Sequence, residues 1–182
     1  MKEYKEIQVA LLGLGTVGLG VYKVLQMQKE EMQHKIGTEI KIKKILVRNL
    51  EKAAGKIEDA SVLTDSWQEI VNDDEIQIVI EVMGGMEPAR TYIMEAMQAG
   101  KQVVTANKDL IAVHGGELLD LAEEHHCDLQ FEASVAGAIP IIHPLKQSLA
   151  GNRITEIMGI VNGTTNYILT RMTEDGMEFS EA

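Results

Sequence analysis

The chain has 182 residues, of which 45% are hydrophobic and 25% charged, and its formal net charge is −11 at pH 7. This hydrophobic share supplies a core and excludes a disordered chain, the acidic balance argues against nucleic acid and anionic membrane surfaces as partners, and no apolar run is long enough to span a bilayer. Cys127 is the sole cysteine, so no intrachain disulfide can form and a reducing, cytoplasmic setting is expected.

The first predicted strand and helix enclose the most informative motif of the chain. Residues 7–12 form a short apolar run typical of a buried strand, and helical spacing of apolar residues predicts a helix from about Thr16 to His34. Between them lies Gly13-Leu14-Gly15-Thr16-Val17-Gly18, with the spacing G-x-G-x-x-G. The first glycine permits a tight turn, the second lets a pyrophosphate approach the backbone, and the third lets the helix pack against the strand. The motif predicts dinucleotide binding; a glycine-rich structural turn is the alternative.

The end of the second predicted strand, residues 40–47, bears on the type of coenzyme. An acidic residue there would bind the ribose 2′-hydroxyl of NAD, but the chain continues Arg48-Asn49-Leu50-Glu51-Lys52. Arg48 could make a planar, bidentate contact with a 2′-phosphate, and Lys52 could add positive charge. The pattern favours NADP(H), with NAD(H) as a further coenzyme; an ordinary solvated arginine is the alternative interpretation.

Strand and helix patterns continue to alternate along the chain. Further strands are expected at residues 62–63, 76–82, 103–105 and 128–132, with helices starting near Asp65 or Ser66, at Pro88 and after residue 105. Gly115-Gly116 is expected to break the last of these helices early. The alternation predicts an α/β fold, a doubly wound Rossmann-type parallel sheet with helices on both faces.

The rhythm changes near Gly151-Asn152, where a strand over residues 154–161 and a helix over 164–172 are expected to open another unit. We therefore expect residues 1–150 to form an NAD(P)-binding domain and residues 151–182 to begin an α+β catalytic and dimerisation domain. Ser180 has the character of a helix N-cap close to the last residue, which suggests truncation; a frayed polar tail is the alternative.

Three further segments lie at the predicted carboxyl ends of strands. Gly84-Gly85 suit close passage of a coenzyme, although a flexible turn would use the same residues. Lys108, after Thr105-Ala106-Asn107, could hold a coenzyme or substrate group or move a proton, and a surface lysine is an equal alternative. Glu132 and the small residues after it offer oxygen ligands to a hard cation, with a tight turn as the default.

Cys127 follows a polar helix end, a poor setting for the thiolate of a cysteine-dependent aldehyde dehydrogenase.

Taken together, four motifs resemble homoserine dehydrogenase: Gly13–Gly18, Thr105–Lys108, Glu132–Pro140 and Gly159–Leu169. The resemblance covers nearly the whole chain in the order of the family. It implies an oxidoreductase that interconverts L-homoserine and L-aspartate 4-semialdehyde with NAD(P)H, in threonine, methionine and isoleucine biosynthesis, and that is a homodimer. An inactive NADP(H)-binding module and a related Rossmann semialdehyde dehydrogenase or reductase are the alternatives.

The resemblance also implies roles for individual residues. Gly15, Thr16 and Val17 would contact the pyrophosphate side of the coenzyme, and Lys108 would lie near the nicotinamide and the reacting carbon. A monovalent cation, usually sodium, would be held mainly by main-chain carbonyls at Glu132, Val135, Gly137 and Ile139. Gly163 would lie in the segment where the catalytic domain returns to the coenzyme.

Family members continue with an acidic substrate-binding segment and then an aspartate and a lysine that acts in proton transfer, and this sequence stops before them. We therefore expect these 182 residues to bind NADP(H) but to turn over homoserine poorly or not at all.

Overall fold

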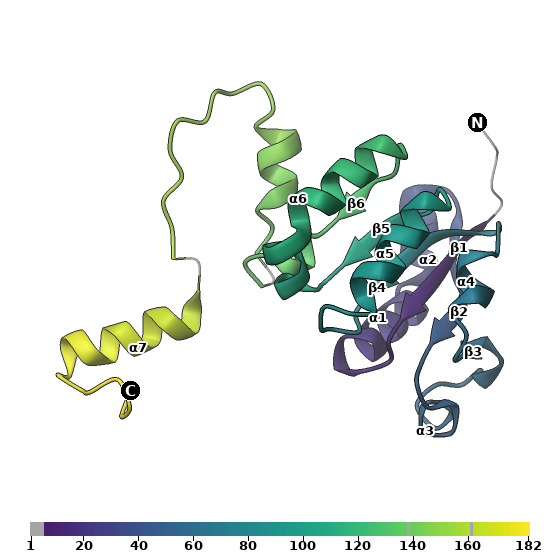
Figure 1. Ribbon diagram of the computed structural model, residues 1–182, viewed down its shortest axis with the longest axis horizontal. Helices are drawn as coiled ribbons and strands as arrows, with labels where there is room; N and C mark the ends of the chain where they lie inside the picture. Colours follow the sequence, from purple (N-terminus) through teal and green to yellow (C-terminus); the bar gives the residue numbers. More distant parts are fainter. Residues whose placement is uncertain (1–5, 138, 161) are drawn as a thin grey trace. The chain divides into compact units, whose positions relative to one another are not determined.

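The computed structural model describes residues 6–137, 139–160 and 162–182 and divides into two compact units, Met1–Ser134 and Val135–Ala182. The first unit contains a six-stranded parallel sheet in the order β3-β2-β1-β4-β5-β6 (Figure 1). This arrangement confirms the predicted α/β, Rossmann-type fold. The functional boundary expected after residue 150 stays a prediction.

The elements of the first unit follow the predicted alternation. The strands are β1 (Glu6–Leu12), β2 (Glu39–Leu46), β3 (Leu63–Thr64), β4 (Ile76–Glu81), β5 (Gln102–Thr105) and β6 (Leu129–Gln130). The helices are α1 (Thr16–Met27), α2 (Lys29–Ile36), α3 (Leu50–Ala54), α4 (Gln68–Val71), α5 (Ala89–Gln98) and α6 (Lys108–Glu124), with 3-10 turns η1 (Ala60–Val62) and η2 (Glu132–Ser134). The second unit contains a π-helical turn, η3 (Pro144–Ser148), and α7 (Gly163–Glu174).

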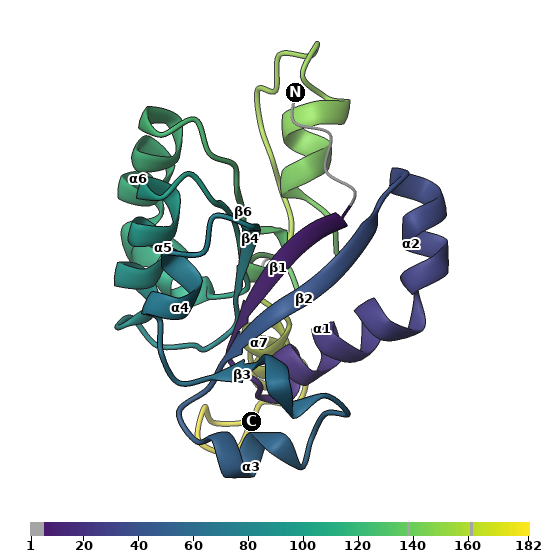
Figure 2. The same cartoon turned by 90° about the vertical axis from the view of Figure 1, so that its right-hand side faces the viewer.

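Helices cover both faces of the sheet, so β1 is buried on both sides. Figure 2 shows α4, α5 and α6 on one side of the strands and α1 and α2 on the other. Successive side chains of a strand point to opposite faces, so Leu12 packs in a cluster with Ile93 of α5, and Leu11 packs in one with Tyr22 of α1. Burial on both faces explains why the last four residues of β1, at positions 9–12, are all apolar rather than alternating.

The connections place a crevice at one edge of the sheet. From β1 the chain builds outward to β2 and β3, and then it crosses back to build β4, β5 and β6 on the other side. Ligands of such sheets bind beyond the carboxyl ends of the strands at the point where the order reverses, which here lies between β1 and β4. This edge carries the glycine-rich turn after β1.

Three expectations for the helices were wrong in detail. The single helix expected over residues 16–34 is two helices, α1 and α2, which meet at Gln28. The helix expected to be capped by Asp65 or Ser66 is α4, whose N-cap is Trp67 without a side-chain cap hydrogen bond. The break expected at Gly115-Gly116 is absent, because α6 runs unbroken from Lys108 to Glu124.

The strand expected over residues 154–161 was also wrong. Residues 154–160 are irregular and exposed, and Val161 lies outside the described residues. Alternating apolar residues form a strand only where another strand pairs with their backbone, and none is found among the described residues of the second unit. No helix in the described part of the chain is long and apolar enough to cross a membrane.

Candidate functional site

The three glycines after β1 have different steric surroundings, which explain why glycine suits each position. Gly13 has a φ of +102°, and a Cβ there would lie 3.1 Å from the Val82 carbonyl oxygen. A Cβ on Gly18 would lie 2.1 Å from the Gly13 carbonyl oxygen, so only glycine lets α1 start this close to β1. A Cβ on Gly15 would meet no atom within 4 Å, which leaves open space beside the backbone. The geometry agrees with the predicted tight turn at Gly13 and close packing at Gly18, and the approach of a pyrophosphate at Gly15 stays a prediction.

The start of α1 is free to receive an anion. Gly15 is the N-cap, no side chain caps the helix, and its first turn contains no acidic residue. Thr16 and Val17, the first two helical residues, are exposed, whereas Gly18 is buried against the strand. The first N–H groups of a helix have no partner within the helix and carry partial positive charge, which favours a phosphate at this position.

A cleft of about 760 Å³ joins the glycine-rich turn to the ends of the neighbouring strands. It brings together four of the predicted site residues, namely Gly13, Gly15, Arg48 and Gly84. Its walls come from the segments that follow β1, β2 and β4, which meet at the same edge because these strands are parallel neighbours. The cleft falls in the size range of cofactor sites.

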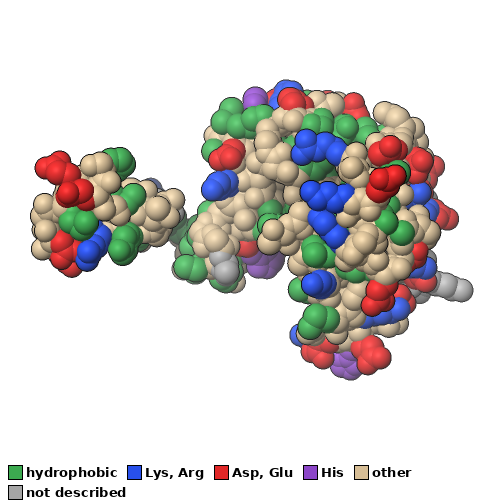
Figure 3. Space-filling view, turned by 90° about the horizontal axis from the view of Figure 1, so that it is seen from below, with side chains coloured by type: hydrophobic (Ala, Val, Ile, Leu, Met, Phe, Trp, Pro, Cys, Tyr) green, Lys and Arg blue, Asp and Glu red, His purple; other side chains and the backbone are tan. Residues whose placement is uncertain are grey.

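Positive side chains line the part of the cleft next to β2. Arg48 lies two residues after the end of β2, is exposed, and pairs with no carboxylate among the described residues. Lys52 and Lys56 also line the cleft, and Lys56 Nζ donates to the Leu14 carbonyl oxygen at 3.0 Å. Figure 3 shows several Lys and Arg side chains near the middle of one face, with Asp and Glu side chains around them. Asp65 and Glu87 also line the cleft, but the three basic side chains next to β2 offer positive charge to a phosphate group.

Glu81, the last residue of β4, is a buried carboxylate that sequence reasoning gave no role. Its side chain is fully buried. Oε1 accepts from Met83 N at 2.8 Å and from Gly84 N at 3.3 Å, and Oε2 accepts from Thr105 Oγ1 at 2.6 Å. The carboxylate therefore shapes the turn that contains Gly84. A glutamate directly after the apolar residues 78–80 of β4 is the signal that could have identified it.

Lys108 begins α6 at the same edge of the sheet. Asn107 caps the helix, because its Oδ1 accepts from Leu110 N at 3.2 Å, and its Nδ2 donates to the Gly85 carbonyl oxygen at 2.6 Å. The side chain of Asn107 therefore links the base of α6 to the turn after β4. Lys108 is exposed, makes no hydrogen bond or ion pair within the described residues, and does not line the cleft.

The residues predicted to hold a monovalent cation fall in both units. Glu132 lies in η2 of the first unit, and Val135, Gly137 and Ile139 lie in the second, where Gly137 has a φ of +62°. The described residues contain no group of three or more His, Cys, Asp or Glu side chains that could hold a metal ion. A site built from main-chain carbonyls is a different arrangement, so the predicted cation site stays a prediction. Ala138 of the same motif lies outside the described residues.

Gly163 is the first residue of α7, in the second unit. Asn162 caps that helix, because its Oδ1 accepts from Thr165 N at 2.8 Å. The predicted role of Gly163 in coenzyme binding stays a prediction.

Cys127 has the character expected of an inert thiol. It is buried, and burial raises the pKa of its thiol, with a smaller contribution from Asp128. Its Sγ lies 3.4 Å from the Met97 carbonyl oxygen. A thiol with a raised pKa is a poor nucleophile, which argues against covalent aldehyde chemistry at this residue.

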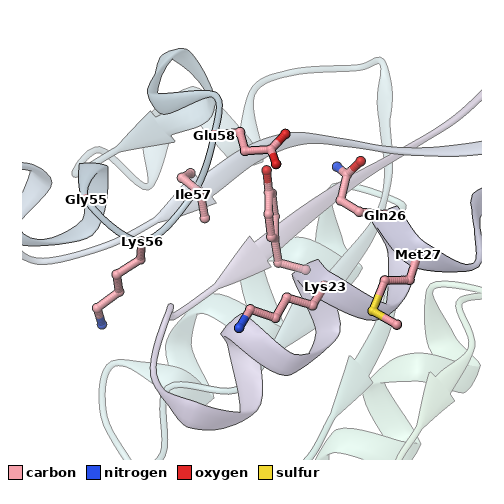
Figure 4. A pocket seen from close by; sticks show the side chains of 8 residues that line it. Lys23, Gln26, Met27, Gly55, Lys56, Ile57 and Glu58 are labelled. Carbon is pink, nitrogen blue, oxygen red and sulfur yellow. The ribbon is translucent and has the colours of Figure 1, made fainter.

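A second hollow, of about 450 Å³, lies beside α1, and its lining differs from that of the cleft. Figure 4 shows Lys23, Gln26 and Met27 on its α1 side, facing Ile57 and Glu58 of the segment after α3. Lys56 lines both spaces. The glycine-rich turn after β1 does not line this hollow, so it lacks the backbone that favours a phosphate in the cleft.

Two family models match the chain. The model described as "Homoserine dehydrogenase, NAD binding domain" covers residues 13–132, and the model described as "Homoserine dehydrogenase" covers residues 140–182. A homoserine dehydrogenase of Bacillus subtilis strain 168 is 49% identical over 177 residues, which are 97% of this chain and 41% of the relative. The chain thus spans about two fifths of the length of this curated relative.

Solved structures agree with these matches. The crystal structure of a homoserine dehydrogenase from Thiobacillus denitrificans is 46% identical and superposes with a TM-score of 0.85, covering 97% of this chain and 41% of that one. A hyperthermophilic archaeal homoserine dehydrogenase in complex with NADPH is 28% identical with a TM-score of 0.78, covering 97% of this chain and 59% of that one.

Proposed function

The chain belongs to the homoserine dehydrogenase family, and from that premise we propose that it carries the NADP(H)-binding domain of an enzyme that interconverts L-homoserine and L-aspartate 4-semialdehyde. One observation carries this proposal: the cleft joins a glycine-rich turn, open beside Gly15, to the guanidinium of Arg48, which pairs with no carboxylate among the described residues. An activity of this kind belongs to threonine, methionine and isoleucine biosynthesis.

The order of the strands supports one orientation of the coenzyme. Across the edge of the sheet, the ends of β2, β1, β4 and β5 carry Arg48, the glycine-rich turn, Gly84 and Lys108 in that order. Neighbouring strands are about 4.8 Å apart, so the row extends over roughly 14 Å. A dinucleotide along this row places its 2′-phosphate at Arg48, its diphosphate at the start of α1 and its nicotinamide toward Gly84 and Lys108. The guanidinium of Arg48 can make a bidentate contact with the 2′-phosphate, which only NADP(H) has, so Arg48 supports NADP(H) over NAD(H).

Lys108 is the residue that we assign to the chemistry. The bound coenzyme supplies the hydride that reduces the semialdehyde carbonyl. Lys108 Nζ, a cation on an exposed helix start, would stabilise negative charge that develops on the carbonyl oxygen and could deliver a proton to it. The N-cap bond of Asn107 fixes the helix turn from which Lys108 projects.

Four parts of the proposal concern the whole protein. A sodium ion at the carbonyls of Glu132, Val135, Gly137 and Ile139 would brace the chain where the two units join in sequence, without taking part in the chemistry. A homodimer is the assembly that the family resemblance favours, and homoserine or aspartate semialdehyde is the small-molecule substrate. The single, buried cysteine suits a reducing cytoplasm.

Replacement of Lys108 by Ala in the whole protein tests the assigned role. We expect homoserine turnover to fall by about 100-fold or more, as for loss of one electrostatic stabiliser of a transition state, while NADPH affinity changes by less than about threefold. Steady-state kinetics and a coenzyme titration measure the two quantities. An unchanged kcat would remove Lys108 from the mechanism. An equal loss of turnover and of NADPH affinity would make it a binding residue only.

A further inference from the structure

A chain of buried polar groups connects the ends of β4 and β5. Glu81 and Thr105 are fully buried, and Asn107 is nearly so. Thr105 Oγ1 donates to Glu81 Oε2 at 2.6 Å and accepts from Asn107 N at 3.0 Å. Buried polar groups of this kind are costly unless every member is paired, and here each of the three side chains has its partners.

The two ends of this hydrogen-bonded network, Glu81 and Asn107, both hold the turn that follows β4. Glu81 Oε1 accepts from the N–H groups of Met83 and Gly84, and Asn107 Nδ2 donates to the Gly85 carbonyl oxygen. Gly84 and Gly85 have φ values of +74° and +77°, so the turn is two consecutive left-handed residues. A glycine pair is intrinsically flexible, and these hydrogen bonds restrict it to one conformation.

We propose that Glu81, Thr105 and Asn107 are positioning residues, which hold the Met83–Gly85 turn and the start of α6 in the one arrangement that receives the nicotinamide half of the coenzyme. The inference rests on the proposed coenzyme binding, because it concerns how that same cleft is organised. The turn lines the cleft at Met83 and Gly84, and Lys108 follows Asn107 directly. The adenine half, at Arg48 on the far side of the glycine-rich turn, does not depend on the network.

Thr105→Val gives the sharpest perturbation. Valine keeps the shape of threonine but leaves Glu81 Oε2 without its donor and Asn107 N without its acceptor. Thr105→Ser restores the hydroxyl and is the rescue variant. Thr64→Val is the matched control, because Thr64 also ends a strand, is buried, and accepts from the N–H two residues on, Ser66 N at 3.0 Å, but does not line the cleft.

Two probes separate the halves of the site. Adenosine 2′,5′-bisphosphate contains the adenine half with the 2′-phosphate, and NADPH contains both halves. Trp67 is the sole tryptophan and stacks on Tyr92, a lining residue of the cleft, with ring centroids 4.5 Å apart. Energy transfer from Trp67 to the reduced nicotinamide therefore reports where that ring is held.

The expected result is a selective loss. Thr105→Val should weaken NADPH by about tenfold, as for one charge-assisted hydrogen bond, and change the affinity for the bisphosphate by less than about twofold. Energy transfer from Trp67 at saturating NADPH should also change. The NADPH affinity of Thr105→Ser should lie within about threefold of that of the unmodified protein. Thr64→Val should leave the ratio of the NADPH and bisphosphate affinities unchanged.

Other results would overturn the inference. A Thr105→Val protein that binds both probes normally, or loses both equally, would show that the network supports the fold alone. If that variant does not fold, Glu81→Gln takes its place, because glutamine keeps the Oε1 acceptor and reverses the hydrogen bond to Thr105; the same ratio decides. An unmodified protein that binds neither probe would instead contradict the proposed coenzyme binding.

Discussion

At the scale of single residues, Gly18 and Gly15 have different expected roles: Gly18 lets α1 pack against β1, and Gly15 leaves space for the coenzyme. Gly18→Ala places a Cβ 2.1 Å from the Gly13 carbonyl oxygen, so we expect a loss of about 2–3 kcal/mol or more in the free energy of unfolding. Gly15→Ala meets no protein atom, so stability should hardly change while NADPH affinity falls, because the methyl group occupies the space where the diphosphate would lie.

Gly20→Ala is the matched control within the same helix. A Cβ on Gly20 also meets nothing within 4 Å, and alanine in a helix interior is favoured over glycine by about 0.5–1 kcal/mol. This variant should be slightly more stable with unchanged NADPH affinity. Urea unfolding and coenzyme titration measure both properties, and a Gly15→Ala protein that binds NADPH as well as Gly20→Ala would contradict the assignment of the turn.

Arg48 is the residue expected to distinguish the two coenzymes. Arg48→Ala should weaken NADPH by about 10- to 100-fold, because a bidentate contact with a 2′-phosphate is lost, and should change NADH by less than about twofold. Lys23→Ala removes an equal charge from α1, where the side chain lines the second hollow and not the cleft. Competition titrations give all four affinities. Equal losses for NADPH and NADH would end the assignment of the 2′-phosphate to Arg48.

At the scale of elements, the unbroken α6 makes a prediction of its own. A Cβ on Gly116 meets no atom within 4 Å, so Gly116→Ala should stabilise the protein by about 0.5–1 kcal/mol. Gly115 is buried, and a Cβ there would lie 3.5 Å from Ile111 Cγ2, an ordinary contact, so Gly115→Ala should be tolerated as well. Urea unfolding measures both. A marked loss of stability in Gly116→Ala would mean that α6 bends or breaks at this pair in solution.

The sequence predicted those elements whose signals are local. Residues 7–12 and 76–82 were identified as strands because both are buried in a parallel sheet and read as apolar runs, and the glycine spacing identified the start of α1. The short helix α3 was not foreseen; Asn49, whose Oδ1 accepts from Lys52 N at 2.8 Å, was the available signal.

Elements and contacts that depend on distant partners could not be foreseen in the same way. Gly115-Gly116 read as a helix break, yet α6 continues because Leu110 and Leu118 bury their side chains against α5 and the sheet. The role of Glu81 depends on Thr105, which is 24 residues away and becomes a neighbour only when β4 pairs with β5. Periodicity within a segment contains no information about such a partner.

At the scale of the whole molecule, paired carboxylates predict how stability depends on pH. Burial raises the pKa of Asp73, but hydrogen bonds from Lys43 Nζ, at 2.6 Å, and from Glu75 N outweigh it and hold the pKa below its ordinary value. A carboxylate with a lower pKa in the folded state contributes stability above its unfolded pKa, and this contribution is lost as the pH falls through the folded pKa. The free energy of unfolding should therefore decrease below about pH 4.

Asp73→Asn tests this dependence. Asparagine keeps an oxygen that accepts from Glu75 N but removes one of the two carboxylate charges that pair with Lys43, the other being that of Glu75. The variant should be less stable than the unmodified protein at neutral pH, and the difference should shrink toward about pH 3. Urea unfolding at a series of pH values gives both curves. Parallel curves over the whole range would show that Asp73 does not contribute to the acid sensitivity.

The whole account depends on the binding of a reduced nicotinamide coenzyme in the cleft beside the glycine-rich turn. Isothermal titration calorimetry of the folded protein with NADPH and with NADH tests this claim most directly. We predict saturable binding of one NADPH per chain, tighter than that of NADH. The absence of heat with both coenzymes from protein that unfolds cooperatively would contradict the account.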